Sequence, residues 1–228
     1  MITQRQEKLL NAIIQEYINS AEPISSNVLE KKYDFNVCPA TIRNEMQRLT
    51  DNGYLFQPHT SAGRIPTDKG YRHFVDNLKI RDFEIGDLPQ ENPKDVIRFS
   101  YSLTKNLAEA SQSLVLTYLK NEGIYLKEGW EDLLDAPEFQ EKDFINSFTK
   151  LLDAFESHIN NADISQGVQV CIGKENPFSK EKNFSIIYSQ FSLPENEDAI
   201  LAIFGPKRMA YEKNIGLINS LNKFLENF

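Results

Sequence analysis

Hydrophobic residues near the start of the chain recur at the spacing of an amphipathic helix. The first pattern begins at a Thr3-x-x-Gln6 pair, which is typical of a capping box, and extends to about Asn19. Its apolar positions are Leu9, Leu10, Ile13, Ile14, Tyr17 and Ile18. Glu22-Pro23 interrupts the pattern, and Ser25-Ser26 supplies an N-cap for a short second helix.

A third helical pattern starts at Pro39, which suits the first turn of a helix, and stops before Gly53, which suits a left-handed C-terminal cap. The predicted helix is about four turns long. Its apolar face carries Ile42, Met46 and Leu49. The opposite face carries Ala40, Thr41, Asn44, Gln47 and Arg48, with Arg43 on its flank. Three helices in this order predict a helix-turn-helix, whose third helix enters a groove of DNA. The alternative is an ordinary surface helix.

The pattern after Gly53 predicts a hairpin. Tyr54–Gln57 is extended, Pro58–Gly63 forms a polar tip, and Arg64–Pro66 is a short return strand. Thr67 can cap a fourth helix, whose apolar positions are Tyr71, Phe74, Val75 and Leu78. Hydroxyl groups, backbone N–H groups and cationic side chains are the usual donors to DNA phosphates, so the tip suits the DNA backbone. A plain surface loop is the alternative.

Together these patterns predict a winged helix-turn-helix DNA-binding domain over residues 1–80. Asn44 is the candidate for contact with an adenine, and Arg43 or Arg48 for contact with a guanine or a phosphate. The hairpin should add affinity with little sequence information. The candidate DNA-binding residues are Ala40, Thr41, Arg43, Asn44, Gln47, Arg48, His59, Thr60, Ser61, Arg64 and Lys69.

The rest of the chain predicts a linker and a second domain. Residues 81–93 are acidic and interrupted by Pro and Gly, as is typical of a linker. Helical patterns then cover Lys94–Gln112, about Glu141–Asn160, and a last segment that starts near Arg208 or Tyr211. Extended patterns cover Ser113–Leu119, Val168–Ile172, Phe184–Phe191 and Ala199–Phe204. Residues 94–228 are therefore predicted to form a small antiparallel sheet covered by helices, which makes the fold class α+β.

Several stretches of the chain match motifs of one known family. In the predicted first domain they are TQRQ at 3–6, EPISS at 22–26, PATIRNEM at 39–46 and QPHTSAGRIPTDKGY at 57–71. In the predicted second domain they are GVQVCIGKENP at 167–177, GPKRMAY at 205–211 and, more weakly, DLLDAPEF at 132–139. These stretches resemble the winged-helix domain and the GAF-like sensor domain of the heat-inducible transcription repressor HrcA family.

The resemblance implies a bacterial, cytoplasmic repressor that binds an inverted-repeat operator upstream of heat-shock chaperone genes as a homodimer. It also implies that the activity is tied to heat and to the chaperonin, and that residues 94–228 form a reduced GAF-like sensor and dimerisation domain. Cys38 departs from the family, whose members usually place a serine at this N-cap. Removal of a good N-cap costs about 0.5–2 kcal/mol.

The segment between Leu119 and Trp130 is a larger departure. Typical members carry several sensor-domain strands and an inserted dimerisation subdomain there, so another surface beyond Lys94 must hold the expected homodimer together. Aromatic residues are the candidates for an uncovered apolar patch. They are Phe144, Phe148, Phe155, Phe224 and Phe228. The alternative is that these rings fill the core.

The balance of charge differs between the two predicted domains. The chain has 25 Lys and Arg against 33 Asp and Glu, a net charge of −8, and a pI near 5.0. By itself this argues against nucleic-acid binding. Residues 1–80 hold ten basic and nine acidic residues, which leaves 15 basic and 24 acidic residues beyond them. Affinity for DNA will therefore depend on where individual cations point. These are Arg5, Lys31, Arg43, Arg48, Arg64, Lys69 and Arg72.

The sequence does not predict an enzyme, a metal site or a cofactor. Five residues separate Gly167 from Gly173 where a P-loop has four, and Glu175 stands where that loop needs Ser or Thr. Two cysteines and three histidines lack ligand spacing. The turn Gly205–Arg208 suits either an anion site at a helix start or a plain turn with surface cations.

No apolar run approaches the roughly 20 residues of a spanning helix, and no cleavable leader pattern is present, so we expect a soluble protein without a membrane partner. Two functions remain open. The first is a sequence-specific, dimeric, DNA-binding repressor. The second is a winged-helix ligand-sensing or protein-interaction module without specific operator binding.

Overall fold

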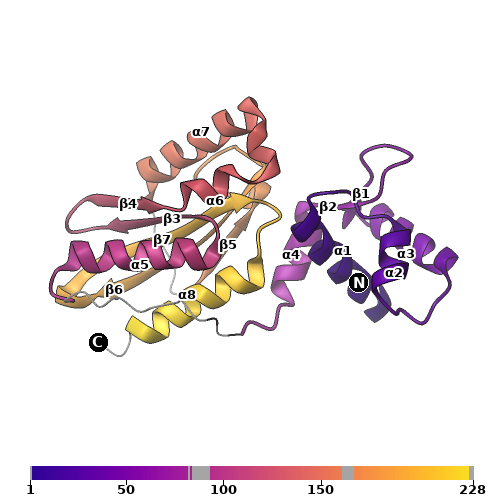
Figure 1. Cartoon of the computed structure of the whole chain (residues 1–228), viewed down its shortest axis with the longest axis horizontal. Coiled ribbons are helices and arrows are strands. Elements are labelled where there is room, and N and C mark those ends of the chain that lie inside the picture. Colours follow the sequence, from indigo (N-terminus) through magenta and orange to yellow (C-terminus); the bar gives the residue numbers. More distant parts are fainter. Residues whose placement is uncertain (1, 82, 84–92, 161–166, 226–228) are drawn as a thin grey trace. The chain divides into compact units, whose positions relative to one another are not determined.

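The computed structural model describes residues 2–81, 83, 93–160 and 167–225. They form two compact units, Met1–Leu78 and Lys79–Phe228, which differ in architecture (Figure 1). The first unit is mainly helical with one small hairpin. The second unit is α+β, with an antiparallel sheet covered by helices, as the sequence predicts, and these helices lie on both faces of the sheet.

The first unit contains its elements in the order that the hydrophobic pattern predicts. They are α1 (Gln4–Ser20), α2 (Ser26–Lys32), α3 (Pro39–Asp51), β1 (Leu55–Phe56), β2 (Ile65–Pro66) and α4 (Asp68–Asp76). Their apolar faces meet in one core of fully or almost fully buried side chains. These include Leu9, Leu10, Ile13, Ile14, Leu29, Ile42, Met46, Leu49, Leu55 and Tyr71.

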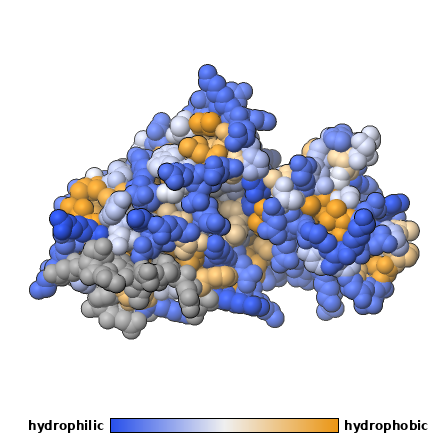
Figure 2. Space-filling view, viewed as in Figure 1, coloured by the Kyte–Doolittle hydropathy of each residue, from blue (hydrophilic) through white to orange (hydrophobic). Residues whose placement is uncertain are grey.

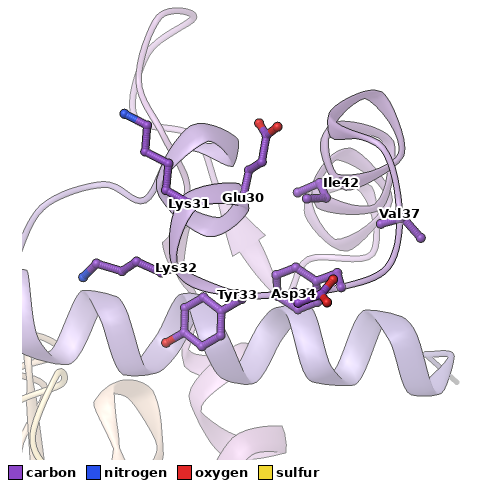
Figure 3. Close-up of a pocket in the computed structure, with 8 residues that line it drawn as sticks. Glu30, Lys31, Lys32, Tyr33, Asp34, Val37 and Ile42 are labelled. Atoms are coloured by element: carbon purple, nitrogen blue, oxygen red, sulfur yellow. The ribbon is translucent and has the colours of Figure 1, made fainter.

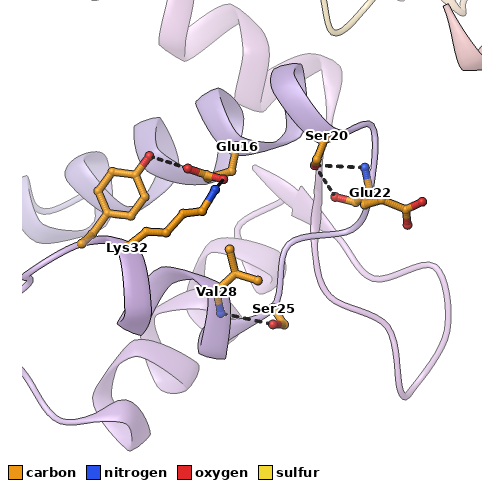
Figure 4. Close-up of polar contacts among 7 residues, drawn as sticks. Glu16, Ser20, Glu22, Ser25, Val28 and Lys32 are labelled. Atoms are coloured by element: carbon orange, nitrogen blue, oxygen red, sulfur yellow. Dashed lines mark hydrogen bonds and ion pairs between the residues drawn. The ribbon is translucent and has the colours of Figure 1, made fainter.

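Side-chain caps fix where the helices of this unit begin. Thr3 and Gln6 form the capping box at the start of α1, with N···O distances of 3.3 and 2.9 Å. The Ser25 hydroxyl accepts the Val28 N–H at the start of α2 (Figure 4). The Thr67 hydroxyl accepts the Gly70 N–H at the start of α4 at 3.1 Å. Each cap satisfies a backbone donor that the first helical turn leaves open.

Glu16 joins α1 to the end of α2. Its carboxylate accepts hydrogen bonds from the Lys32 ammonium at 2.5 Å and the Tyr33 hydroxyl at 3.0 Å (Figure 4). The hydrogen bond with Lys32 is the main cause of a lowered pKa of Glu16. Burial, with the adjacent Glu16, raises the pKa of Tyr33. This polar contact fixes α2 against α1 and so helps to set the position of α3.

The second unit contains a five-stranded antiparallel sheet in the order β4-β3-β7-β6-β5. Its strands are β3 (Leu114–Leu119), β4 (Ile124–Glu128), β5 (Gln169–Ile172), β6 (Phe184–Leu193) and β7 (Glu197–Pro206). Its α-helices are α5 (Val96–Ser111), α6 (Trp130–Leu134), α7 (Lys142–Ile159) and α8 (Tyr211–Leu225). Short 3₁₀ turns, η1 to η3, lie at Pro137–Gln140, Gly173–Glu175 and Pro194–Asn196.

The helices of the second unit divide between the two faces of the sheet (Figure 1). Helices α5 and α8 cover one face, and α6, η1 and α7 cover the other. Most of the predicted linker 81–93 lies outside the described residues. Phe83, at its start, donates its N–H to the Ser220 hydroxyl of α8 at 3.2 Å.

Aromatic rings fill the core between α7 and the sheet, and this corrects one expectation. The sequence offers Phe148 and Phe155 as members of an uncovered patch, but they are 1% and 0% exposed. Both rings pack edge-on against Phe204, and Phe148 also meets Phe184. Phe144 is half-buried against the same cluster. Phe224 is half-buried, and Phe228 lies outside the described residues. Phe148 and Phe155 are covered because α7 packs over this face of the sheet.

Candidate nucleic-acid interface

One face of α3 is polar and exposed along most of its length. Five of the predicted DNA-binding residues are exposed there, and Thr41 is half-buried. The five are Ala40, Arg43, Asn44, Gln47 and Arg48. The opposite face is buried through Ile42, Met46 and Leu49. This division follows from the helical period, because the apolar positions are spaced by four and three residues.

The start of α3 lacks the side-chain cap that the other helices of the unit have. Cys38 occupies the N-cap position without a capping hydrogen bond. This agrees with the sequence-based expectation, because a thiol is a poorer acceptor than a serine hydroxyl. Its Sγ lies 3.2 Å from the Thr41 hydroxyl, and this hydrogen bond is the main cause of a lowered pKa of the Cys38 thiol. Pro39 occupies the first turn.

A buried carboxylate holds the middle of α3 against α1. Glu45 is 7% exposed and accepts a hydrogen bond from the Gln6 amide at 2.7 Å. Arg48 contacts the other oxygen of Glu45 at 3.3 Å, while its own side chain stays 66% exposed. A buried carboxylate needs such partners, so this contact is chiefly structural. Arg48 therefore contributes to the fold and still presents donors to solvent.

The hairpin strands β1 and β2 pair with each other, and the hairpin also pairs with the segment before α2. Ile24 and Arg64 exchange two backbone hydrogen bonds of 2.9 and 2.8 Å. Gly63 permits this approach, because a Cβ atom there would lie 2.5 Å from the Ile24 carbonyl carbon. The base of the hairpin is thereby fixed, and its tip projects beyond the helices (Figure 1).

Hydrogen bonds within the hairpin order its tip. The Gln57 amide donates to the carbonyl groups of Thr60 and Ala62, each at 3.0 Å. The His59 ring nitrogen Nδ1 lies 3.1 Å from the Ser61 hydroxyl. His59, Thr60 and Ser61 are all exposed. Gln57 is a residue that sequence reasoning did not assign a role, although it opens the longest family-like motif.

Two of the predicted phosphate-binding cations contact α3. The Arg64 guanidinium donates to the Thr50 hydroxyl and to Gln47 Oε1, each at 3.0 Å. The Lys69 ammonium donates to the Asn52 carbonyl at 2.8 Å and lies 4.3 Å from the centre of the Tyr54 ring. Sequence spacing could not reveal these hydrogen bonds, because they join residues 14 or 17 positions apart.

Arg43 and Asn44 differ from these two cations. Arg43 Nε donates to the Ser26 hydroxyl of α2 at 3.2 Å, and its side chain remains exposed. Asn44 is exposed and makes no side-chain hydrogen bond with any residue that the structure describes. The exposed face of α3 therefore combines a free amide with cations that are partly fixed in position.

Two surface clefts are formed by described residues. A cleft of about 490 Å³ lies beside α2 and α3 (Figure 3). Glu30 of α2 and Ile42 of α3 both line it, Lys31 extends away from it, and Lys32 pairs with Glu16. A second, of about 350 Å³, lies in the second unit beside Lys105 and Trp130. Both are open and lined by groups of mixed charge.

Arg208, at the end of the turn Gly205–Arg208, forms an ion pair with Glu138 of η1. Arg208 contacts both carboxylate oxygens of Glu138, at 2.5 and 2.8 Å, and so joins the end of β7 to η1. This contact favours the structural alternative for that turn over an anion site. In the part of the chain that the structure describes, no three His, Cys, Asp or Glu residues lie close enough to hold a metal ion. None of the described helices is both long and apolar enough to cross a membrane.

The fold and the exposed face of α3 define an α+β protein whose first unit presents a polar helix face beside an ordered hairpin. A family model described as the HrcA protein C terminal domain matches residues 77–215. The chain therefore belongs to the HrcA family. That match covers the second unit almost completely, which explains why its internal motifs resemble the family as well.

Curated relatives carry the name heat-inducible transcription repressor HrcA. The protein of Brevibacillus brevis is 27% identical over 327 positions, covering 97% of this chain and 96% of the relative. That of Natranaerobius thermophilus is 28% identical, covering 94% and 93%. That of Alkaliphilus metalliredigens is 64% identical, but over 77 residues, or 34% of this chain and 22% of the relative.

The lengths of these alignments bear on the shortened middle of the chain. An alignment of 327 positions cannot be filled by 228 residues, so the Brevibacillus relative contains many residues without a counterpart here. A solved structure described as a hypothetical protein at 2.2 Å resolution superposes with a TM-score of 0.79 at 21% identity. It covers 100% of this chain and 98% of its own, and it supports the fold.

Proposed function

We propose that this protein is a transcriptional repressor that binds double-stranded DNA through the first unit, which acts as a winged helix-turn-helix. Helix α3 is the recognition helix and the β1–β2 hairpin is the wing. The observation that carries the proposal is the exposed polar face of α3. On this face the Asn44 side chain makes no hydrogen bond with the described residues, and Arg43 donates one hydrogen bond, to Ser26. Family membership supports the same function, because the curated relatives are named as heat-inducible repressors.

The proposed roles follow from the donors and acceptors that each side chain offers. Asn44 matches the edge of adenine, and Arg43 or Arg48 can donate to guanine or to phosphate. The exposed hydroxyl groups of Thr60 and Ser61, with the His59 ring, suit the sugar-phosphate backbone near the hairpin tip. Lys69 can add a phosphate contact at the C-terminal end of α3, where its ammonium already lies.

We further propose that the protein acts as a homodimer on an inverted repeat upstream of chaperone genes. A two-fold dimer matches two half-sites about one turn of DNA apart. The second unit is the proposed GAF-like dimerisation domain. Figure 2 shows separate apolar patches on an otherwise hydrophilic face. Among the described residues of this unit, the exposed large apolar side chains are those of Ile80, Ile97, Tyr101, Trp130 and Leu134.

Duplexes from the region upstream of the chaperonin genes of the source organism provide a direct test of operator binding. The full chain should bind a duplex with an inverted repeat more tightly than a scrambled duplex of the same composition, at matched salt. Equal affinity for both duplexes would favour the alternative, a winged-helix module for ligand or protein interaction. Sedimentation of the full chain tests the dimer, and replacement of Ile97 and Tyr101 by Glu should weaken it.

A further inference from the structure

The Gln47 side chain on α3 has two intramolecular partners of opposite kind. Its Oε1 accepts a hydrogen bond from Arg64 at 3.0 Å, and its Nε2 donates to Asp51 Oδ1 at 2.7 Å. Asp51 lies one turn further along α3, whereas Arg64 comes from the hairpin. The amide of Gln47 therefore connects the hairpin with the C-terminal half of α3.

These two partners allow one orientation of the Gln47 amide. A guanidinium can only donate, so it requires the amide oxygen, and an ionised carboxylate can only accept, so it requires the amide nitrogen. Rotation of the amide by 180° would place donor against donor and acceptor against acceptor. The usual ambiguity between the two orientations of a glutamine amide is thus removed by chemistry.

Each polar atom of this amide keeps capacity for one more hydrogen bond. Oε1 has a second lone pair, and Nε2 has a second hydrogen. The Gln47 side chain is exposed, so both remain accessible to a ligand. An acceptor beside a donor is the combination that recognises the N6 and N7 atoms of adenine in the major groove.

The position of Arg64 is itself fixed by the fold. Its backbone exchanges two hydrogen bonds with Ile24, and its Nε donates to the Thr50 hydroxyl at 3.0 Å. The side chain is half-buried, and its planar fork spans Thr50 and Gln47 on successive positions of one helix face. A cation that served mainly to bind phosphate would not need a hydrogen bond to a glutamine amide, whereas one that orients this amide needs the contact with Gln47, which the backbone pairing with Ile24 holds in place.

We propose that Arg64 is a positioning residue that acts through Gln47. It presets the Gln47 amide so that α3 prefers adenine at one position of the DNA site, and it thereby makes the hairpin a determinant of sequence specificity. This inference rests on the proposed DNA-binding function and changes the role of Arg64 within it. The hairpin contributes backbone affinity at its tip and sequence preference at its base.

Single-base variants of the preferred duplex provide the test. Gln47→Ala should lower the preference for one A·T pair by roughly 5- to 150-fold, the range for a bidentate contact. Arg64→Ala should reduce the preference at the same pair, and the double variant should lose no more than Gln47→Ala alone. Arg64→Lys, which keeps the charge but lacks the planar fork, should fail to restore the preference.

Two controls separate positioning from charge and from general stability. The slope of log affinity against log salt should stay the same in Arg64→Ala, as it should in Lys8→Ala, which removes an exposed cation from α1. Thr50→Val removes the other acceptor of Arg64 without touching Gln47, and it should keep the preference. If Arg64→Ala instead weakened all duplexes equally and lowered the slope by about one, Arg64 would be a phosphate contact and the inference would be wrong.

A measurement without DNA distinguishes this inference from the proposed function. In the free protein, the Gln47 side-chain amide should give two well-separated, slowly exchanging NMR signals that collapse toward random-coil positions in Arg64→Ala. Random-coil signals in the wild-type protein would overturn the positioning role. Ordered signals in a protein that shows no sequence preference for DNA would overturn the proposed function while leaving the contact between Arg64 and Gln47 intact.

Discussion

The two units of this protein use their family-like motifs for different purposes. In the second unit two motif residues have a structural role: Arg208 pairs with Glu138, and Tyr211 is fully buried with its hydroxyl 2.7 Å from Ser185. In the first unit, motif residues such as Asn44 and His59 lie on the surface and have no packing role. Family resemblance in a core indicates a shared fold, whereas resemblance on a surface indicates a shared interaction.

The long motif of the hairpin contains residues of both kinds. Gly63 allows the approach of Ile24, and Thr67 caps α4 and donates to the Gly53 carbonyl at 2.7 Å. These residues are explained by the fold. The side chains of His59 and Ser61 are exposed and contact each other, which gives them no evident role in the fold. They therefore remain candidates for contact with a partner. The division supports DNA binding at the tip.

Phe148→Ala should produce the largest effect and should be confined to the second unit. Phe148 is 1% exposed and contacts the rings of Phe139, Phe184 and Phe204, so its truncation leaves a cavity that should cost about 3–5 kcal/mol of stability. Trp130, the sole tryptophan, lies in this unit and reports its denaturant unfolding by fluorescence. Lys150→Ala, at an exposed position of the same helix, is the control, and a destabilisation below about 1 kcal/mol in Phe148→Ala would contradict the aromatic core.

Asn44→Ala should affect binding without affecting folding. Truncation of a base-reading side chain on the recognition helix should cost about 1–3 kcal/mol of affinity for the preferred duplex and relax specificity at one position. The midpoint of thermal unfolding should not change, because the Asn44 side chain makes no hydrogen bond with the described residues. Unchanged discrimination between the preferred duplex and its single-base variants would remove Asn44 from the interface.

Gly63→Ala should loosen the hairpin. The added Cβ would lie 2.5 Å from the Ile24 carbonyl carbon, so the backbone pairing of Ile24 with Arg64 has to open, at a cost of about 1–3 kcal/mol. Hydrogen exchange at the Ile24 amide should speed up. Ser61→Ala is the control, since it changes an exposed residue of the same hairpin without adding atoms near Ile24. Equal protection of Ile24 in wild type and Gly63→Ala would contradict the docked hairpin.

Glu16→Gln should give the smallest effect, and the effect should depend on pH. The folded pKa of Glu16 is lowered by Lys32, so its stabilising contribution is present above the unfolded pKa near 4.5 and disappears as the pH falls through the folded value. The wild-type protein should therefore be more stable than the variant at neutral pH, by under about 1 kcal/mol for this half-solvated pair, and the difference should vanish in acid. If the difference in stability between the wild type and Glu16→Gln did not change with pH, the contribution of Glu16 would come from packing and not from its charge.

Local patterns predict most of the first unit. The caps at Thr3, Ser25 and Thr67, and the division of α3 into two faces, follow from nearest-neighbour chemistry, and the structure has them at the predicted positions. The contact of Arg64 with Gln47 could not be predicted, because it depends on how the hairpin packs against α3. Which side of α3 is exposed is thus readable from the sequence, but the partners of its side chains are not.

The second unit is predicted less completely, for a physical reason. The sequence pattern does not predict strand β4, because all five of its residues are half-exposed at the edge of the sheet and their polarity does not alternate. It leaves open whether Phe148 and Phe155 are buried, since hydrophobic character alone does not tell a covered face from an uncovered one. Both errors concern tertiary packing at distant positions.

Selection of DNA from a random pool of duplexes by the full-length protein tests the central claim most directly. The account predicts enrichment of an inverted repeat whose half-sites lie about one helical turn apart, and disappearance of that enrichment in Asn44→Ala. The logarithm of the affinity for the enriched duplex should also fall linearly with the logarithm of the salt concentration. Recovery of a pool without any shared sequence, by a protein that is folded and pure, would contradict DNA reading by α3.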